Sequence, residues 1–235
     1  VENSEEFGKA AFNEVYKVVK NNPSATLGLA TGSTPLPLYA EMVKDHRDRG
    51  TSYKDVRTFN LDEYVGLPAS HKESYVNFMT RNLFSKIDVD MKSVNIPCGT
   101  AENVDEECAR YSALLKNAVI DIQVLGIGGN GHIAFNEPGT PFDSVTHRVW
   151  LTEKTINDNS RFFGQIDEVP KSAITMGIGE IMRAKKILML ASGKNKADAV
   201  FRMISGKVDE SCPASVLQLH PSVTVILDKE AASKL

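Results

Sequence analysis

The densest group of side chains that could do chemistry lies between Gly126 and Glu137, where four glycines are interspersed with an amide, an imidazole and a carboxylate. An imidazole exchanges protons near neutral pH, and a nearby carboxylate can orient it. His132 and Glu137 therefore form a candidate acid–base pair, with Asn130 beside them. A lone loop histidine more often satisfies a backbone carbonyl, but this concentration of glycines and polar groups favours a functional loop.

The same glycines match the pattern G-x-G-x-x-G, which is typical of dinucleotide-binding turns. That pattern works only where it opens a helix, because the helix N-terminus receives the pyrophosphate. Here the chain runs within a few residues into Pro138 and Gly139, which do not continue a helix. We therefore expect neither NAD nor FAD.

Two adjacent carboxylates, Asp62 and Glu63, follow a strand-like segment at residues 56–61. Neighbours on an extended chain point in opposite directions, so at most one of the two is expected to face a ligand. For two acids taken alone, a solvated acidic loop is the more frequent arrangement.

A third segment, Thr31-Gly32-Ser33-Thr34-Pro35, follows the first buried strand. Gly32 permits a left-handed turn, Thr34 is a candidate N-cap, and Pro35 suits a first helical position. Backbone N–H groups and hydroxyls at a helix N-terminus suit a phosphate, although an ordinary capped turn has the same pattern. A nucleotide P-loop is excluded, because no Gly-Lys pair is followed by Ser or Thr.

Arg161 and Lys196 could complete a phosphate clamp, although each taken singly is more often a surface charge. Metal binding has little support. The five histidines never occur three to five residues apart, and no H-E-x-x-H motif is present. We therefore expect no metal site.

Strand-like and helical segments alternate along the chain, which predicts a mostly parallel sheet covered by helices on both faces. The ligand site of such a sheet lies at the carboxyl ends of its strands. The predicted strands are residues 27–30, 56–61, 121–127, 187–191 and 223–227, and the predicted helices are 4–20, 35–48, 75–84, 102–118, 172–184 and 195–205. Ser4 and Ser172 are candidate caps of their helices. Residues 136–172 fit this alternation least, and we interpret them as a long excursion with a lid at about 140–172.

The composition and charge of the chain argue against several classes of partner. The chain has 235 residues, 42% of them hydrophobic and 24% charged, with a net charge of −3, so nothing favours nucleic acid or an anionic membrane as a partner. The longest apolar run, Ile187–Ala191, is too short to cross a bilayer. Three cysteines without a C-x-x-C motif indicate reduced thiols and a cytoplasmic location. No linker divides the sequence, so we expect one domain over residues 1–235.

Seven segments, in order along nearly the whole chain, resemble the glucosamine-6-phosphate deaminase family. They are Leu29–Pro35, Asn60–Gly66, Gly126–Gly139, Asn159–Phe163, Val169–Lys171, Ser192–Ala197 and Leu217–Pro221. The segments Leu61-Asp-Glu-Tyr64 and Gly131-His-Ile-Ala-Phe-Asn-Glu-Pro138 are highly specific in combination. The resemblance implies a three-layer Rossmann-like α/β/α domain without an organic cofactor. It also implies that glucosamine 6-phosphate and water are converted to fructose 6-phosphate and ammonia.

The resemblance also implies roles for individual residues. His132 matches the residue that opens the sugar ring, with Glu137 orienting it, and Asp62 matches the base that moves a proton from C2 to C1. Thr31, Gly32, Ser33 and Thr34, together with Arg161 and Lys196, match positions that bind the phosphate of a small-molecule sugar phosphate.

Two departures from the family pattern affect these expectations. Asn130 stands where many members carry Asp, so it is expected to orient His132 without adding charge. His147 and Val149 stand where allosteric hexamers carry Arg and Lys, and the chain stops at Leu235, before those members end. We expect no allosteric control and a monomer or small homo-oligomer. A sigmoidal rate curve that N-acetylglucosamine 6-phosphate made hyperbolic would contradict this.

Three other functions stay open at this stage. A 6-phosphogluconolactonase shares the fold and similar phosphate loops, but it needs no base over C2. A galactosamine-6-phosphate deaminase differs only in the orientation of one substrate hydroxyl. A sugar-phosphate sensor would keep the pocket without needing both Asp62 and His132.

Overall fold

The computed structural model describes residues 1–160 and 163–235, with the backbone alone at positions 154, 158 and 159. Its main sheet has six strands in the order β4-β2-β1-β5-β8-β9, and every neighbouring pair is parallel. The strands are β1 Thr26–Leu29, β2 Arg57–Asn60, β4 Val94–Asn95, β5 Ile122–Gly126, β8 Ile187–Ala191 and β9 Val223–Leu227. The prediction of a mostly parallel α/β sheet is confirmed.

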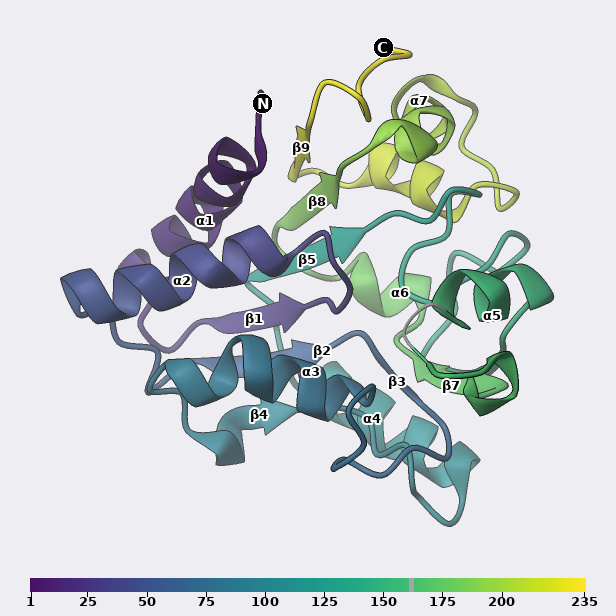
Figure 1. The fold of residues 1–235 in the computed structure, drawn as a ribbon, viewed down its shortest axis with the longest axis horizontal. Helices are drawn as coiled ribbons and strands as arrows, with labels where there is room; N and C mark the ends of the chain where they lie inside the picture. The colour runs from purple at the N-terminus through teal and green to yellow at the C-terminus, as the bar shows by residue number, and fades with distance from the viewer. Residues whose placement is uncertain (161–162) are drawn as a thin grey trace.

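Helices cover both faces of this sheet, as the alternating pattern predicts. Figure 1 shows α2 and α3 in front of the strands, with α4 and α6 behind them. The helices are α1 Ser4–Asn21, α2 Leu36–Arg49, α3 Tyr75–Asn82, α4 Val104–Lys116, α5 Glu153–Ser160, α6 Ile178–Ile181 and α7 Ala197–Ser205. Short 3-10 turns lie at Phe84–Lys86, Met91–Ser93, Ile166–Glu168, Lys194–Lys196 and Pro213–Leu219.

The core explains why the strands form where they do. All five residues of β8 are buried, and the main hydrophobic cluster runs from Phe7 near the start of the chain to Ala231 near its end. A strand covered by helices on both faces must be apolar on both faces, so it reads as a continuous apolar run.

Two predicted helix caps are wrong. Asn3 caps α1, because its side chain accepts a hydrogen bond from the N–H of Glu6 at 2.9 Å, one residue before the predicted Ser4. At α2 the N-cap position is Pro35, and no side chain caps it, so Thr34 does not have the predicted role.

The predicted helix at 172–184 is also wrong over most of its length. Ser172–Thr175 forms β7, a strand with all four residues buried, and only Ile178–Ile181 is helical. β7 is the centre of a second, antiparallel sheet, between β3 Asp62–Tyr64 and β6 His147–Trp150. These two partners come from far along the chain, so local capping signals around Ser172 cannot reveal them.

The excursion at 136–172 thus contains β6 and α5, which the sequence pattern does not predict. Its side chains pack against the small sheet in a second apolar cluster of buried residues: Tyr64, Phe135, Leu151, Phe163, Val169 and Ala173. This packing brings α5 to the carboxyl end of the main sheet, on the right-hand side of Figure 1.

Candidate active site

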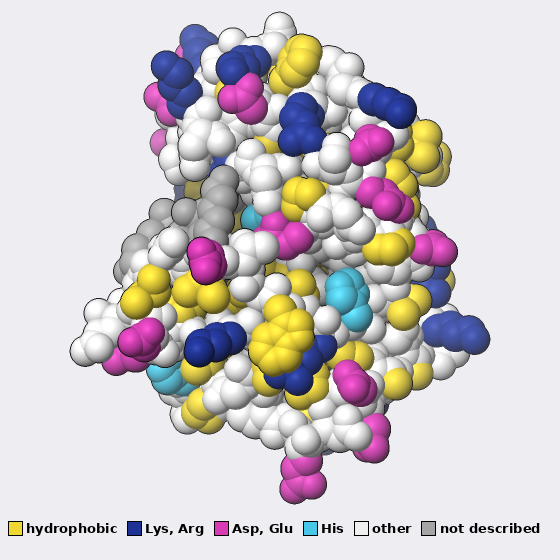
Figure 2. All heavy atoms as spheres, turned by 90° about the vertical axis from the view of Figure 1, so that its right-hand side faces the viewer, with side chains coloured by type: hydrophobic (Ala, Val, Ile, Leu, Met, Phe, Trp, Pro, Cys, Tyr) yellow, Lys and Arg dark blue, Asp and Glu magenta, His cyan; other side chains and the backbone are white. Residues whose placement is uncertain are grey.

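The loops that follow β1, β2, β5 and β8 converge at the carboxyl end of the main sheet, where α/β folds bind ligands. Figure 2 shows the face of the molecule at this end, with imidazole and acidic side chains next to each other near its centre. The segments singled out in the sequence meet here.

The loop after β5 holds His132 against its own backbone. The N–H of Gly128 donates to the carbonyl of His132 at 2.9 Å. A Cβ on Gly128 would lie only 2.2 Å from Cε1 of the His132 ring, so no larger residue fits beneath the imidazole. Gly131 has φ +93°, and a Cβ there would lie 2.5 Å from Sγ of Cys212. These glycines are thus explained by the close packing of the loop, independently of any dinucleotide.

A tight turn then brings Glu137 back toward His132. Asn136 is fully buried, and its amide donates to the carbonyls of Ile133 at 3.0 Å and Met176 at 2.9 Å. Ala134 takes the left-handed conformation with φ +51°, which is uncommon for a residue other than glycine. Asn136 is not among the residues that the sequence pattern singles out, although its place in the specific segment was a signal.

Glu137 is surrounded by polar side chains. Its Oε2 accepts from the amide of Asn130 at 2.6 Å, and its Oε1 accepts from the hydroxyl of Thr155 at 2.7 Å. Nδ1 of His132 lies 3.6 Å from the same Oε1. Burial raises the pKa of Glu137, but these three polar neighbours outweigh burial and hold the pKa at about 2. Glu137 is therefore charged at neutral pH.

The amide of Asn130 ties the loop together. Its oxygen accepts from the backbone N–H of His132 at 3.1 Å, while its NH₂ group donates to Glu137. An aspartate has no such donor and would place two carboxylates against each other. The structure brings Asn130, His132 and Glu137 together, as the sequence predicts.

Asp62 has the opposite environment. It is 7% exposed, and among residues 1–160 and 163–235 no group donates a hydrogen bond or forms an ion pair to its carboxylate. Burial, with a smaller contribution from the negative charge of Glu63, raises the pKa of Asp62 from 3.8 to about 8. A carboxylate in this state is a stronger base than a solvated aspartate.

The neighbouring Glu63 is turned away from Asp62 and is used structurally. Its carboxylate accepts from the backbone N–H groups of Tyr64, Tyr75 and Val76 at 2.8, 3.0 and 3.0 Å. Two of these donors lie at the N-terminus of α3, which attracts negative charge. The two acids thus face opposite ways as predicted, whereas a solvated acidic loop is wrong, because Glu63 is only 1% exposed.

The segment Thr31–Thr34 connects β1 to α2 at the same end of the sheet. Gly32 takes φ +97° and is exposed, and a Cβ added to it would meet no described atom within 4 Å. The hydroxyl of Tyr39 holds the base of this turn, because it donates to the carbonyl of Ala30 at 2.5 Å and accepts from its N–H at 3.2 Å. The turn therefore presents Gly32 and Ser33 to solvent from a fixed base.

Lys196 lies in the turn between β8 and α7. Gly193 in this turn has φ +90°, and its N–H donates to the carboxylate of Asp228 at 2.9 Å. A Cβ on Gly129 would lie 3.6 Å from the carbonyl oxygen of Asn195, so the loops after β5 and β8 touch. Lys196 is thus close in the fold to the His132 loop. Arg161, the other predicted phosphate ligand, lies outside the described residues.

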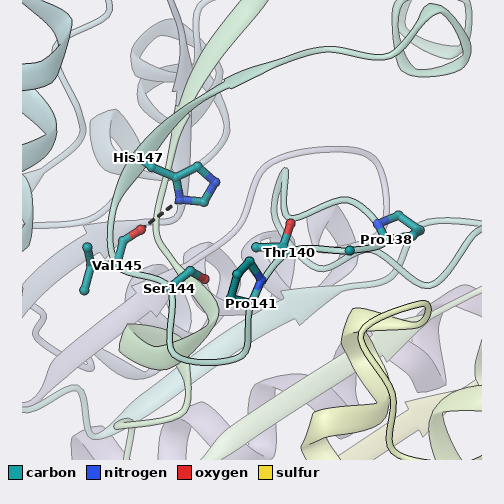
Figure 3. A pocket seen from close by; sticks show the side chains of 7 residues that line it. Pro138, Thr140, Pro141, Ser144, Val145 and His147 are labelled. Carbon is teal, nitrogen blue, oxygen red and sulfur yellow. Dashed lines mark hydrogen bonds between the residues drawn. The ribbon is translucent and has the colours of Figure 1, made fainter.

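Two open pockets of about 510 and 500 Å³ share Val145 and His147, and the first also includes Pro138, which follows Glu137 in the chain. Figure 3 shows the first, where His147 Nδ1 is hydrogen-bonded to the carbonyl of Val145 at 2.8 Å. Neither pocket is lined by Asp62 or His132. The candidate site is therefore assigned from the convergence of its side chains.

Two further kinds of feature are absent from the described part of the chain. Within it, no group of three or more His, Cys, Asp or Glu side chains is placed to hold a metal ion. No described helix is both long enough and apolar enough to cross a membrane.

Known proteins resemble this chain over its whole length. It is 52% identical over 231 residues to a glucosamine-6-phosphate deaminase of Clostridium novyi, covering 98% of this chain and 96% of that protein. It is 55% identical over 218 residues to that of Halalkalibacterium halodurans, covering 92% and 89%. A solved structure described as a monomeric glucosamine-6-phosphate deaminase of the NagB superfamily superposes with a TM-score of 0.98 at 45% identity, covering 100% and 98%.

A more distant structure shares the fold alone. The 6-phosphogluconolactonase of Trypanosoma brucei superposes with a TM-score of 0.80 at 21% identity, covering 100% of this chain and 96% of that one. Residues 2–226 match the family described as glucosamine-6-phosphate isomerases/6-phosphogluconolactonase. The chain belongs to this family.

Proposed function

We propose that this protein is a glucosamine-6-phosphate deaminase, which converts glucosamine 6-phosphate and water to fructose 6-phosphate and ammonia. The observation that carries the proposal is the buried Asp62, which has no hydrogen-bond or ion-pair partner among the described residues and lies at the same end of the sheet as the His132–Glu137 pair. The reaction needs a base for a carbon-bound proton and a separate group that exchanges protons between oxygens. The relatives at 45–55% identity are deaminases, which supports this activity over lactone hydrolysis.

Ring opening comes first and is assigned to His132. The imidazole takes the proton of the anomeric hydroxyl and delivers a proton to the ring oxygen as the C1–O5 bond breaks. Both transfers occur between oxygens, which suits an imidazole, because its ring can accept one proton and donate another. Glu137 stays charged and stabilises the cationic form of the ring, while Asn130 fixes the loop through the His132 N–H.

Proton transfer at carbon is assigned to Asp62. Its carboxylate removes the proton from C2 of the open-chain aldehyde, and the electron pair forms the C1=C2 double bond of an enolamine. The π electrons of the C1=O1 bond move to O1, which takes a proton from the amino group on C2. The protonated Asp62 then returns the proton to C1, which leaves an imine at C2. Water adds to that imine, and ammonia leaves from C2 as the ketone forms. A carboxylate whose pKa is raised to about 8 suits the first of these transfers, because a stronger base removes a carbon-bound proton more readily.

The phosphate is assigned to Thr31, Gly32, Ser33 and Thr34, with Lys196 and Arg161 as its cations. The open turn after β1 and the Lys196 turn after β8 lie at the same sheet end as Asp62, which supports this assignment. Binding the phosphate away from the reacting carbons supplies energy that positions C1 and C2. Closure of residues 140–172 over the substrate, a monomer or small homo-oligomer, and a cytoplasmic location belong to the same proposal.

The test is product formation from glucosamine 6-phosphate, with the galactosamine epimer and 6-phosphogluconolactone assayed in parallel. Equal amounts of ammonia and fructose 6-phosphate are expected, with the epimer ratio defining the preferred sugar. Lactone cleavage without ammonia release would contradict the assignment of Asp62. Binding of sugar phosphates without turnover of any of them would indicate a sensor and overturn the proposal.

A further inference from the structure

Helix α5 reaches the candidate site through one side chain, Thr155. This residue is 8% exposed, and its hydroxyl donates to Oε1 of Glu137 at 2.7 Å. The contact joins two segments that are 18 residues apart in the chain. No feature of the sequence singled out Thr155, because threonine in the first turn of a helix is ordinary.

The hydrogen bonds around Thr155 fix the direction of its hydroxyl. A threonine hydroxyl has one proton to donate, and Thr155 gives that proton to Glu137. Oγ1 of Thr152 lies 3.0 Å from Oγ1 of Thr155, so Thr152 must be the donor in that pair. Oγ1 of Thr152 also accepts from the backbone N–H of Thr155 at 3.2 Å, which is a capping contact at the start of α5. Two hydroxyls in series thus lead from the N-terminus of α5 to the Glu137 carboxylate.

The oxygen at the end of this series is the one that faces the imidazole. Oε1 of Glu137 lies 3.6 Å from Nδ1 of His132, and this buried nitrogen has no hydrogen-bond partner in the described part of the chain. The other oxygen, Oε2, is held by Asn130. Thr155 therefore restrains the carboxylate rotation that sets the distance between Oε1 and Nδ1.

From this geometry we propose that Thr155 is a positioning residue for ring opening, which acts on His132 through Glu137. The proposal rests on the proposed function for its kinetic effect, but its structural basis is independent of the substrate. Helix α5 then contributes to the acid–base site, so the position of the excursion at 136–172 affects ring opening as well as entry of the substrate.

The test compares Thr155→Val with Thr155→Ser and with Thr140→Val. The valine removes the hydroxyl at nearly constant shape, and the serine keeps it. Thr140 is a matched control, because its hydroxyl donates at 2.7 Å to the backbone carbonyl of the same residue, Glu137. We expect Thr155→Val to lower kcat for glucosamine 6-phosphate about tenfold, with the serine and Thr140→Val variants within about twofold of the wild type.

Two readouts separate positioning from a structural role. The Kd of 2-amino-2-deoxyglucitol 6-phosphate, an open-chain ligand that needs no ring opening, should change less than about twofold in Thr155→Val. The ¹⁵N signals of the His132 ring should shift in Thr155→Val and stay in place in Thr140→Val. If the valine variant does not fold, Thr155→Ala replaces it in all three measurements.

An unchanged kcat and unchanged ring signals in Thr155→Val would overturn the inference, and so would a loss of open-chain ligand binding in parallel with kcat. A wild-type protein that releases no ammonia would instead contradict the proposed function. In that case the ring signals of His132 still decide whether Thr155 positions the pair.

Discussion

Asp62 and Glu137 are two carboxylates at the same end of one sheet, and their surroundings make them chemically different groups. Asp62 is buried without a described hydrogen-bond or ion-pair partner, and its pKa is raised to about 8. Glu137 has three polar neighbours, and its pKa is held at about 2. The surroundings of each carboxylate therefore set its role: Asp62 can take a proton, and Glu137 stays charged.

The fold produces this difference through the direction of side chains. Asp62 and Glu63 are successive residues of β3, so they point to opposite sides. Glu63 accepts the three nearby backbone N–H groups, two of them at the start of α3, and Asp62 receives none of them. Glu137 lies instead after a tight turn, where side chains from its own loop and from α5 converge on it.

Removing the base should have the largest effect. Asp62→Asn keeps the shape but cannot take a proton, so we expect kcat for ammonia release to fall by about 10³-fold or more. Binding of the open-chain ligand should persist, because the phosphate loops are unchanged. Activity above about a tenth of the wild type would show that another group removes the C2 proton.

Neutralising Glu137 should lower kcat less than replacing Asp62. Glu137→Gln keeps a polar side chain beside Asn130 and Thr155 but removes the charge that stabilises the cationic imidazole. We expect kcat to fall roughly 10- to 100-fold in the same assay. A loss as large as that of Asp62→Asn would mean that the two carboxylates do not have the separate roles inferred from their surroundings.

The pH dependence of kcat/KM tests Asp62 as the base without a substitution at that residue. The base must be ionised, so kcat/KM should rise with pH and level off above about 8, the pKa of Asp62 in the free protein. The rise should approach tenfold per pH unit on its acidic side. Glu137→Gln should keep this limb in place, because Glu137 does not titrate in that range. A limb that moved with Glu137→Gln would assign the titration to the His132 pair instead.

Local sequence patterns were sufficient to predict two strands of the main sheet and the functional loop after β5. The strands 187–191 and 223–227 match β8 and β9 residue for residue, because a buried parallel strand is a local apolar run. The loop residues Asn130, His132 and Glu137 meet because they lie close together in the chain.

The features that the sequence did not predict depend on contacts between residues far apart in the chain. Ser172 pairs with β6 in place of capping a helix, and Thr155 matters only because α5 folds back onto Glu137. The opposite pKa shifts of Asp62 and Glu137 follow from burial and hydrogen bonding, which the residue types alone do not encode. Such long-range contacts override local propensity.

The pH dependence of stability offers a further test of Asp62, whose carboxylate has no partner in the described part of the chain. In the unfolded chain Asp62 ionises near pH 4, whereas in the folded protein it keeps its proton up to about pH 8. Unfolding therefore releases a proton between these values, and the wild type loses stability as pH rises through them. Asp62→Asn lacks this loss, so its Tm should exceed that of the wild type at pH 8 by roughly 10 °C or more. The difference should nearly vanish at pH 4, and a difference that did not depend on pH would contradict the burial of an isolated charge.

The smallest expected effect tests the amide beside Glu137. In Asn130→Asp the new carboxylate would lie where the amide nitrogen is 2.6 Å from Oε2 of Glu137. Repulsion raises the folded-state pKa values of both acids, so the variant should lose stability as pH rises from about 4 to 7, by roughly 2 to 4 °C in Tm. Asn130→Ala removes the hydrogen bond without adding charge, so its Tm deficit should stay constant over this range.

Activity of Asn130→Asp should stay within about tenfold of the wild type, because His132 can offset the added charge. A constant Tm deficit in Asn130→Asp as well would mean that the amide contributes its hydrogen bond alone, and that the charge balance around Glu137 does not depend on residue 130.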